Sequence, residues 1–432
     1  MLARVLWNLL KLRRDQWLPK KTLEKIQLQK LKTIIRHAYD NVPFYRQFYD
    51  QHGVHPNQLG SLDDICKFPI LSKDLARDLT LKERTAFGVD ISRCTIRTSS
   101  GSTGVPVSIL ENNQSSDYYD AYMLRRLLEY GYRPWKKIFR LSTLPQRSNY
   151  PNYEKARTGL MKKFYMNRVK RLVISDDIEK YLDIMVEIQP EFIIGPPSYL
   201  KVLAENSRER KITDLSLKVI VSCGEILENS TRNFLSSNLN SQVYDGYGCV
   251  EIAPLGMAWE CRERSGLHIN MDVAFLEFLK DGEPISYGEK GEVVATSLFR
   301  FATPMIRYRV GDVATLSNEV CPCGREMPLI ENIEGRIVDF LKTPAKGMIS
   351  PYAVMYALQS IQGIAKYQVI QNKTKKIEIN IEKNKKFNKN TITEIRDTCI
   401  KLFGFDLQIE VNMIKNFPIK RGQKFRLVKS SV

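Results

Sequence analysis

The chain has 432 residues, of which 43% are hydrophobic and 26% are charged. This composition is typical of a globular protein with two or three domains, and it excludes a disordered, collagen-like or disulfide-stapled small protein. Lysine and arginine number 66 against 48 aspartate and glutamate residues, so the formal net charge is +18. A charge of this sign attracts polyanions, among them nucleotides, nucleic acids and anionic lipids.

The eight cysteines are scattered along the chain, apart from the near neighbours Cys321 and Cys323. This spacing does not resemble a secreted disulfide framework, so we expect a reducing, cytoplasmic compartment. Residues 2–14 place apolar residues at helical spacing among arginines and a lysine. They predict either an amphipathic helix packed on the main domain or a basic interfacial helix in weak peripheral contact with anionic lipid. No stretch of the sequence has membrane-spanning length.

The pattern of apolar residues predicts a helical start followed by an α/β layer structure. Residues 23–50 read as helix, interrupted near Pro43. From about residue 90, short β-rich runs alternate with helical stretches, which indicates buried strands between helices. The β-rich runs begin at 138, 171, 192 and 217, and the helical stretches are 115–130, 177–188, 198–209 and 229–239. Antiparallel-looking strands beginning at 272 and 291 then predict a distorted sheet or barrel.

The pattern of predicted elements changes again beyond Arg336. Two strands, a helix near 391–403 and a further strand predict a small α+β domain of ferredoxin-like type. We therefore expect an N-terminal domain over residues 1–336 and a C-terminal domain over residues 337–432. The predicted fold class is α/β: a large domain of α/β layers with a distorted β-barrel, followed by a small α+β domain.

Residues 98–107, with the sequence TSSGSTGVPV, form the strongest local motif. Glycines let a backbone turn and approach a ligand closely, while hydroxyl and N–H groups donate to phosphate oxygens. The motif is not a Walker loop, because it lacks Gly-Lys-Ser/Thr and its flanks read strand, loop, strand. The motif therefore predicts a phosphate-binding loop, with a plain flexible hairpin as the alternative.

This loop and five later segments, in this order, resemble the motifs of the adenylate-forming acid ligases. The later segments are SCGEIL at 222, YGCVE at 247, YRVGD at 308, EGR at 334 and RGQK at 421. HAYDNVPFYR at 37 and FPILSKDL at 68 resemble the phenylacetate-CoA ligase branch, and GRIVDFLKTPAKG at 335 resembles its relatives in capsular polysaccharide biosynthesis. The resemblance covers nearly the whole chain. Each motif alone is weakly specific, whereas the set of motifs in the expected order is strongly specific.

The resemblance implies an AMP-forming ligase. A carboxylate attacks the α-phosphorus of ATP, giving acyl-AMP and pyrophosphate, and the acyl group then passes to a thiol or another nucleophile. The implied cofactors are ATP and Mg²⁺, the partners are a small carboxylic acid and CoA or an acyl carrier protein, and no nucleic acid is expected. A role in cell-surface polysaccharide modification is also implied, with the C-terminal domain as a mobile lid.

The same resemblance assigns roles to individual residues. Glu251 matches the Mg²⁺-binding carboxylate, and carboxylate oxygens suit this hard cation. Lys424 matches the lysine that reaches the α-phosphate and the attacking carboxylate. The β- and γ-phosphates would be held by Ser99, Ser100, Gly101, Ser102, Thr103 and Gly104. The remaining nucleotide contacts would be Gly224, Glu225, Tyr247 and Gly248 around adenine, Asp312 at the ribose hydroxyls and Arg336 at the ribose or phosphate edge.

The sequence departs from the family's pattern at two sites. Val338 and Asp339 stand where an acidic pair usually includes the hinge, and Val107 stands where many adenylating enzymes have lysine. The acid pocket would draw on residues 139–150 and 195–200, which core packing explains equally well. The sequence defines neither the acid nor the acyl acceptor.

A second constellation combines Cys261, His268, Cys321 and Cys323. Three thiolates and an imidazole suit tetrahedral Zn²⁺, and a full set of four protein ligands would make the metal structural. Cys-X-Cys is tighter than the usual Cys-X-X-Cys, so unrelated buried thiols are the alternative. Some relatives carry such Cys/His sets in this region, which favours zinc.

Two other classes of function stay open alongside the ligase. The charge of +18 and the cysteine cluster also fit a basic, zinc-containing nucleic-acid-binding protein. A noncatalytic, membrane-associated scaffold is the other alternative, although Glu251, Asp312 and Lys424 favour catalysis.

Overall fold

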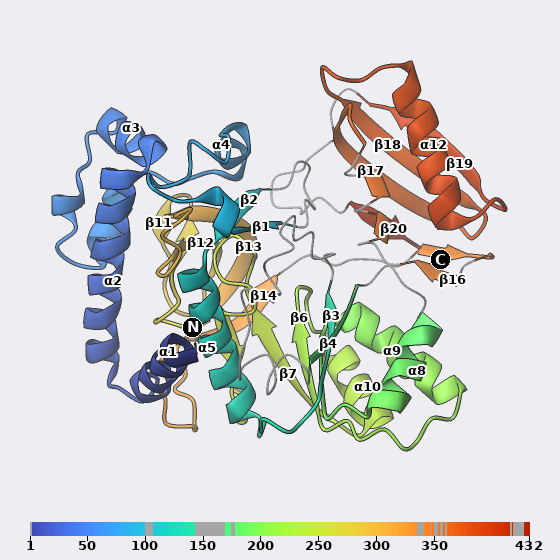
Figure 1. Ribbon diagram of the computed structural model, residues 1–432, viewed down its shortest axis with the longest axis horizontal. Helices are drawn as coiled ribbons and strands as arrows, with labels where there is room; N and C mark the ends of the chain where they lie inside the picture. The colour runs from blue at the N-terminus through green and yellow to red at the C-terminus, as the bar shows by residue number, and fades with distance from the viewer. Residues whose placement is uncertain are drawn as a thin grey trace.

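The computed structural model consists of a large unit built on one extended sheet and a smaller α+β unit that follows it in the chain (Figure 1). The structure describes residues 2–99, 107–142, 169–173, 178–334, 341–345, 347–349, 353–354, 357–358, 361–414, 417 and 427–432. The longer helices are α1 (Leu2–Asp15), α2 (Lys20–Asn41), α3 (Pro43–Gln51), α4 (Lys73–Asp78), α5 (Asn113–Glu129), α8 (Ile178–Ile188), α9 (Pro197–Glu209), α10 (Asn229–Leu239) and α12 (Lys389–Phe403). Short 3₁₀ helices span Pro56–Gln58, Asp63–Lys67 and Ile91–Arg93.

The central sheet contains twelve strands among the described residues. They are β3 (Ile138–Ser142), β4 (Val169–Val173), β5 (Phe192–Gly195), β6 (Val219–Cys223), β7 (Gln242–Tyr247), β8 (Ala258–Glu260), β9 (Leu267–Ile269), β10 (Ala274–Lys280), β11 (Glu283–Pro284), β12 (Lys290–Ser297), β13 (Tyr308–Ser317) and β14 (Leu329–Glu334). Their order is β11-β10-β12-β13-β14-β9-β8-β7-β6-β5-β3-β4. The strands from β4 to β7 are parallel, and the strands from β7 to β11 are antiparallel.

The central parallel strands β5 and β6 are buried on both faces, which explains their continuous apolar runs. Successive side chains of a strand point to opposite faces of the sheet. In β5, Ile193 joins the core beneath α8, α9 and α10, whereas Phe192 and Ile194 join the core on the other face. Figure 1 shows α8, α9 and α10 together on one side of these strands and α5 on the other. The α/β alternation predicted from residue 90 onwards is therefore confirmed, and the predicted helix at 229–239 coincides with α10.

The antiparallel strands differ in one respect from the predicted barrel. They extend the same twelve-stranded sheet instead of forming a separate barrel within the described residues. The predicted distortion is present, because the pairing register shifts between Glu292 and Val294 and again between Thr315 and Leu316. Short strands β8 and β9 join the antiparallel part to β7.

The N-terminal helix α1 packs against α5 (Figure 1). Its inner face buries Val5, Leu9 and Leu12 in the main core. Arg4 pairs with Asp117 of α5 at 2.8 Å, which fixes the start of the helix against its neighbour. This packing agrees with the prediction that residues 2–14 form an amphipathic helix packed on the main domain. Among the described helices, none combines the length and apolar composition that a membrane span requires.

The smaller unit has a four-stranded sheet in the order β19-β18-β17-β20. Its strands are β17 (Ile364–Lys373), β18 (Lys376–Lys383), β19 (Gln408–Met413) and β20 (Val428–Ser430). It has its own apolar core, which includes Val369, Ile379 and Phe403. Helix α12 connects β18 to β19, and these two strands are adjacent and parallel, whereas a ferredoxin-like sheet places another strand between such a pair. The predicted boundary after Arg336 falls within residues 335–340, outside the described residues, and stays a prediction.

Two hairpins complete the fold. The first pairs β1 (Thr95–Thr98) with β2 (Ser108–Glu111), and Thr98 lies opposite Ser108. These strands flank the TSSGSTGVPV motif, so the two strands expected on either side of it are present. The second pairs β15 (Leu341–Thr343) with β16 (Gly347–Ile349).

Candidate functional site

A cavity of about 1050 Å³ lies at the carboxyl ends of β6 and β7. In open α/β sheets, ligands bind at this edge of the strands. Seven residues predicted from separate sequence segments line this cavity: Ser99, Gly224, Glu225, Tyr247, Gly248, Glu251 and Asp312. The fold therefore brings together side chains that are up to about two hundred positions apart in the sequence.

Tyr247 and Asp312 both line the cavity and contact each other. The Tyr247 hydroxyl donates to Oδ2 of Asp312 at 3.1 Å. The neighbouring Gly248 has no room for a side chain, because a Cβ atom there would lie 2.1 Å from the carbonyl oxygen of Ala253. A glycine is thus required where β7 turns into the cavity.

Glu251 is almost fully buried, with 3% of its surface exposed. The Tyr308 hydroxyl donates to its Oε1 atom at 3.1 Å. Burial, together with the neighbouring carboxylate, raises the pKa of Tyr308, which keeps the phenol protonated as a donor. The carboxylate is therefore held in a fixed orientation at the cavity wall.

Ser99 and Val107, the described residues that border the predicted phosphate loop in sequence, are hydrogen-bonded to each other. Its backbone N–H donates to the carbonyl oxygen of Val107 at 2.9 Å. In return, the backbone N–H of Val107 donates to the Ser99 hydroxyl at 2.9 Å. The remaining predicted loop residues, Ser100, Gly101, Ser102, Thr103 and Gly104, lie outside the described residues, as do Arg336 and Lys424.

Glu225 links the cavity to the start of α9. Its carboxylate accepts from the backbone N–H of Ser198 at 3.0 Å and from the Ser198 hydroxyl at 2.8 Å. Ser198 belongs to the segment 195–200, which the sequence analysis assigned to the acid pocket. The carboxylate of Glu225 therefore connects the expected nucleotide side of the cavity to the expected acid pocket.

Charged residues that the sequence analysis did not select also line the cavity. They are Lys73, Glu228, Arg232, Asp245, Glu260, Arg264 and Glu331. Arg232 donates to both carboxylate oxygens of Glu260, at 2.7 and 3.0 Å. Lys73 lies within the FPILSKDL segment, and Asp245 lies two residues before Tyr247. Their positions within or beside a motif could have identified these two residues as site candidates.

Asp245 has an unusual electrostatic environment. Desolvation and the neighbouring charge of Glu260 raise its pKa to about 7. Its Oδ1 atom accepts from the backbone N–H of Gly246 at 2.9 Å. A carboxyl group of this pKa exchanges between acceptor and donor forms near neutral pH.

Two cysteines beside this cavity are not activated. Burial raises the pKa of Cys223 to about 12, and burial also raises the pKa of Cys249 well above its ordinary value. A thiol with a raised pKa is a poor nucleophile at neutral pH.

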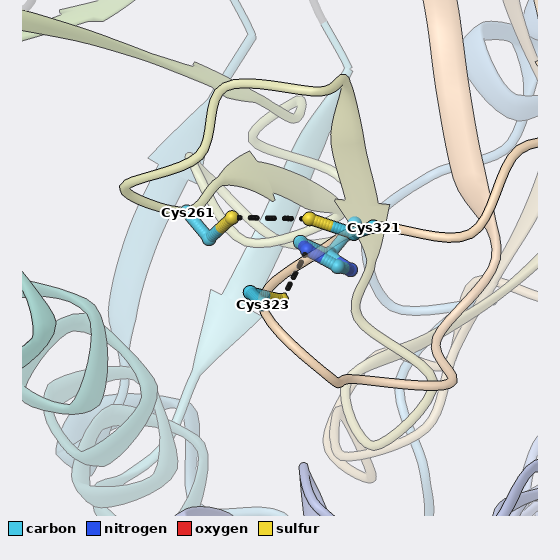
Figure 2. A group of neighbouring side chains, drawn as sticks. Cys261, Cys321 and Cys323 are labelled. Atoms are coloured by element: carbon cyan, nitrogen blue, oxygen red, sulfur yellow. Dashed lines mark hydrogen bonds between the residues drawn. The ribbon is translucent and has the colours of Figure 1, made fainter.

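The four residues of the Cys/His constellation also come together. Figure 2 shows the thiol side chains of Cys261, Cys321 and Cys323 directed toward a common point. The candidate ligand atoms of these residues and of His268 all lie within 4.8 Å of one another. The two closest pairs are Cys261 Sγ with Cys321 Sγ at 3.5 Å and Cys323 Sγ with His268 Nε2 at 3.4 Å.

These separations fit a tetrahedral zinc site. Zn–S and Zn–N bonds of about 2.3 and 2.0 Å place neighbouring ligand atoms roughly 3.5–3.8 Å apart in a tetrahedron. A sulfur separation of 3.5 Å is far longer than the ~2.05 Å of a disulfide bond. The donor set and spacing therefore suit a metal ion better than a covalent bridge.

The residues that follow Cys323 contact the N-terminal helical segment. Arg325, two residues after Cys323, stacks its guanidinium 4.0 Å from the ring centroid of Trp17. The backbone N–H of Lys20 donates to Glu326 at 2.7 Å. Residues just beyond α1 are thus attached to the segment that carries two of the candidate ligands.

Comparison with known proteins adds three matches. Residues 341–431 match the model of the CapK C-terminal domain. The phenylacetate-coenzyme A ligase of Escherichia coli is 32% identical over 330 residues, covering 74% of this chain and 72% of the relative. Protein CapK of Staphylococcus aureus is 23% identical over 281 residues, covering 62% of this chain and 60% of the relative.

Solved structures support the fold. A crystal structure of 2-hydroxyisobutyryl-CoA ligase with 2-HIB-AMP and CoA superposes with a TM-score of 0.69 at 22% identity, covering 96% of this chain and 91% of that one. The same ligase in its postadenylation state gives a TM-score of 0.65 at 21% identity, with coverage of 96% and 91%.

The phenylacetate-coenzyme A ligase of Thermus thermophilus is 30% identical over 339 residues, covering 75% of this chain and 72% of the relative. With two phenylacetate-coenzyme A ligases at this level of identity and coverage, the chain belongs to the phenylacetate-coenzyme A ligase family of AMP-forming acid–CoA ligases.

Proposed function

We propose that the protein activates a small carboxylic acid with ATP and transfers the acyl group from acyl-AMP to the thiol of CoA. One observation carries this proposal: seven residues chosen from four sequence segments line a single cavity. Unrelated polar residues scattered over the chain have no physical reason to converge at the carboxyl edge of a parallel sheet.

In this proposal, Tyr247 and Asp312 bind the nucleoside. The Asp312 carboxylate accepts from the two ribose hydroxyls, and the Tyr247 hydroxyl holds that carboxylate in place through its 3.1 Å hydrogen bond. The ring of Tyr247 lies against adenine. Gly224, Glu225 and Gly248 complete the adenine side, and Arg336 approaches the ribose or phosphate edge.

The phosphates occupy the side of the cavity bordered by Ser99 and Glu251. Loop residues 99–104 donate hydroxyl and N–H hydrogens to the β- and γ-phosphates. Mg²⁺, when bound, neutralises phosphate charge beside Glu251. Lys73, which lines the same cavity, adds a positive charge to it.

The chemistry proceeds in two displacements. A carboxylate oxygen of the acid attacks the α-phosphorus of ATP, and the bond from that phosphorus to the bridging oxygen of pyrophosphate breaks. Lys424 donates to the α-phosphate and to the attacking carboxylate as negative charge accumulates between them. The thiolate of CoA then attacks the acyl carbon, and AMP leaves with the oxygen of the acid.

The acyl acceptor and biological role form a finer part of the proposal. The match of residues 341–431 to the CapK C-terminal domain, and the similarity to Protein CapK, support a role in cell-surface polysaccharide modification. An acyl carrier protein is the alternative thiol partner. In this proposal, the positive charge of the chain attracts its polyphosphate substrates, ATP and CoA.

We also propose that Cys261, His268, Cys321 and Cys323 hold a structural zinc ion. Support comes from the donor set and from ligand separations of 3.5 and 3.4 Å in the two closest pairs. This centre would stabilise the connection between β8, β9 and the segment before β14, without a part in acyl transfer.

Pyrophosphate exchange with a broad panel of carboxylic acids tests the proposed activity. We expect exchange of labelled pyrophosphate into ATP with at least one acid, and trapping of the acyl-adenylate by hydroxylamine. Glu251→Gln provides the matched negative enzyme, because it removes the charge at the Mg²⁺ position and keeps the side-chain shape. Equal exchange by the parent and by Glu251→Gln would show that the observed activity does not use this cavity as proposed.

A further inference from the structure

The outer face of α1 exposes large apolar side chains although the inner face is packed. Leu6, Trp7 and Leu10 expose 45%, 70% and 64% of their surfaces, and Trp17, just beyond the helix, exposes 52%. Single exposed apolar residues are ordinary, but a group on one element marks an interaction surface.

The exposed residues follow one stripe of the helix. Residues three and four positions apart share a helical face, so Leu10 continues the face begun by Leu6 and Trp7. Arg13 and Arg14 come three and four positions after Leu10, whereas Trp17 lies beyond the end of the helix, where its ring stacks on Arg325. We define the outer stripe of α1 as Leu6, Trp7, Leu10, Arg13 and Arg14.

The charge around the outer stripe is positive. Lys11, Arg13 and Arg14 are exposed, whereas the acidic residue of the helix, Asp15, is buried and pairs with Arg14. A second copy of the chain placed on this face would bring like charges together. An anionic surface instead complements them, and tryptophan beside arginine is typical of helices at a membrane–water interface.

We propose that the outer stripe of α1 docks the enzyme on a bilayer surface containing anionic phospholipid. Leu6, Trp7 and Leu10 enter the boundary between headgroups and acyl chains, and Arg13 with Lys11 meets the headgroup phosphates. The inner face keeps its contacts with α5, so docking requires no unfolding of the helix. The surface is separate from the nucleotide cavity, so this inference stands or fails independently of the proposed reaction.

Sedimentation of the full chain with vesicles tests the proposal. The vesicles contain phosphatidylglycerol and phosphatidylcholine in one arm and phosphatidylcholine alone in the other. We expect binding to the anionic vesicles that weakens with salt. The variant Trp7→Gln/Leu10→Gln should bind at least ~10-fold more weakly, because it removes the inserting side chains. The matched control is Trp135→Gln/Phe405→Gln, which alters two side chains that are 66% and 88% exposed outside α1.

Each result decides the question. Loss of vesicle binding in Trp7→Gln/Leu10→Gln but not in the control supports the proposal, provided that both variants retain the parental melting temperature. Quenching of tryptophan fluorescence by brominated lipid in the parent, lost in the same variant, supports it independently. Failure of the parent to bind anionic vesicles overturns it. Equal binding by both variants also overturns it, as does concentration-dependent dimerisation that only Trp7→Gln/Leu10→Gln abolishes.

Discussion

The hydroxyl of Tyr247 donates to the carboxylate of Asp312 at 3.1 Å, although the two residues are 65 positions apart. Tyr247 ends β7 and Asp312 lies within β13, and three strands separate β7 from β13 in the sheet. The hydrogen bond therefore connects the parallel and antiparallel parts of the sheet and fixes the proposed ribose acceptor.

Replacing Asp312 should weaken ATP use most strongly. Asp312→Ala removes the acceptor for two ribose hydroxyls, and each hydrogen bond to a charged group contributes about 1.5–3 kcal/mol. We expect kcat/KM for ATP in pyrophosphate exchange to fall ~10²-fold or more. Tyr247→Phe, which removes the hydroxyl and keeps the ring, should cost only ~10-fold. A smaller effect for Asp312→Ala than for Tyr247→Phe would contradict the assigned order of roles.

Lys424→Ala should slow adenylate formation while leaving ATP binding unchanged. Loss of one transition-state donor typically costs ~10²-fold, so adenylate formation should fall by at least that factor while ATP binding is retained. Lys429→Ala is the matched control, because it removes an exposed lysine five positions further along the same tail. Single-turnover adenylate formation and equilibrium ATP binding measure the two quantities. Parental rates in Lys424→Ala would remove this lysine from the mechanism.

Asp245 should make the stability of the ligand-free protein fall as the pH rises. Its pKa is raised from 3.8 to about 7, so between these values the folded protein holds a proton that the unfolded chain has released. Under this condition the free energy of unfolding decreases with increasing pH. Because the side chain also lines an open cavity, we expect solvent to limit the effect to roughly 2 kcal/mol.

Asp245→Asn tests this linkage. The amide stays neutral, so the stability of the variant relative to the parent should increase from pH 3.8 to about pH 7, the interval between the ordinary and the raised pKa. Denaturant unfolding at several pH values gives the comparison. Asp281→Asn, which makes the same substitution at an exposed aspartate that does not line the cavity, is the control. A constant difference between parent and Asp245→Asn at every pH would mean that Asp245 titrates normally.

The cysteine cluster should contain close to one zinc ion per chain. Metal analysis of protein purified without added zinc should detect it, and Cys323→Ser should lose both the metal and several degrees of melting temperature. Cys66→Ser is the control, since Cys66 is exposed and lies outside the cluster. Absence of stoichiometric metal from the parent would end the zinc proposal.

The sequence was most informative where a pattern reflects local physics. The apolar run FIIG predicted β5, and the apolar spacing of residues 229–239 predicted α10, because burial on both sheet faces and on one helix face dictates these patterns. Strands β8 and β9 escaped prediction because three residues are too few to show a period. Their position in the sheet also depends on pairing partners distant in the chain.

The site was predictable where residues belong to motifs, and less so where single charged side chains arrive from elsewhere. Glu251 and Asp312 were recognised by their neighbours in sequence. Arg232 and Glu260 were missed, because an isolated ion pair leaves no pattern until folding brings its members together. The same reason explains why Asp245 was overlooked, since its raised pKa arises from desolvation on folding and from Glu260, fifteen positions later.

The contact between Glu225 and Ser198 has a practical consequence for changing the preferred acid. One carboxylate lines the cavity on the proposed adenine side and also anchors the first turn of α9 through two hydrogen bonds. Redesign of positions 196–199 to admit a bulkier tail would shift that anchor and alter nucleotide affinity at the same time. Selection for a new acid should therefore be run at saturating ATP, so that variants with the desired tail preference are not discarded for weaker adenine binding.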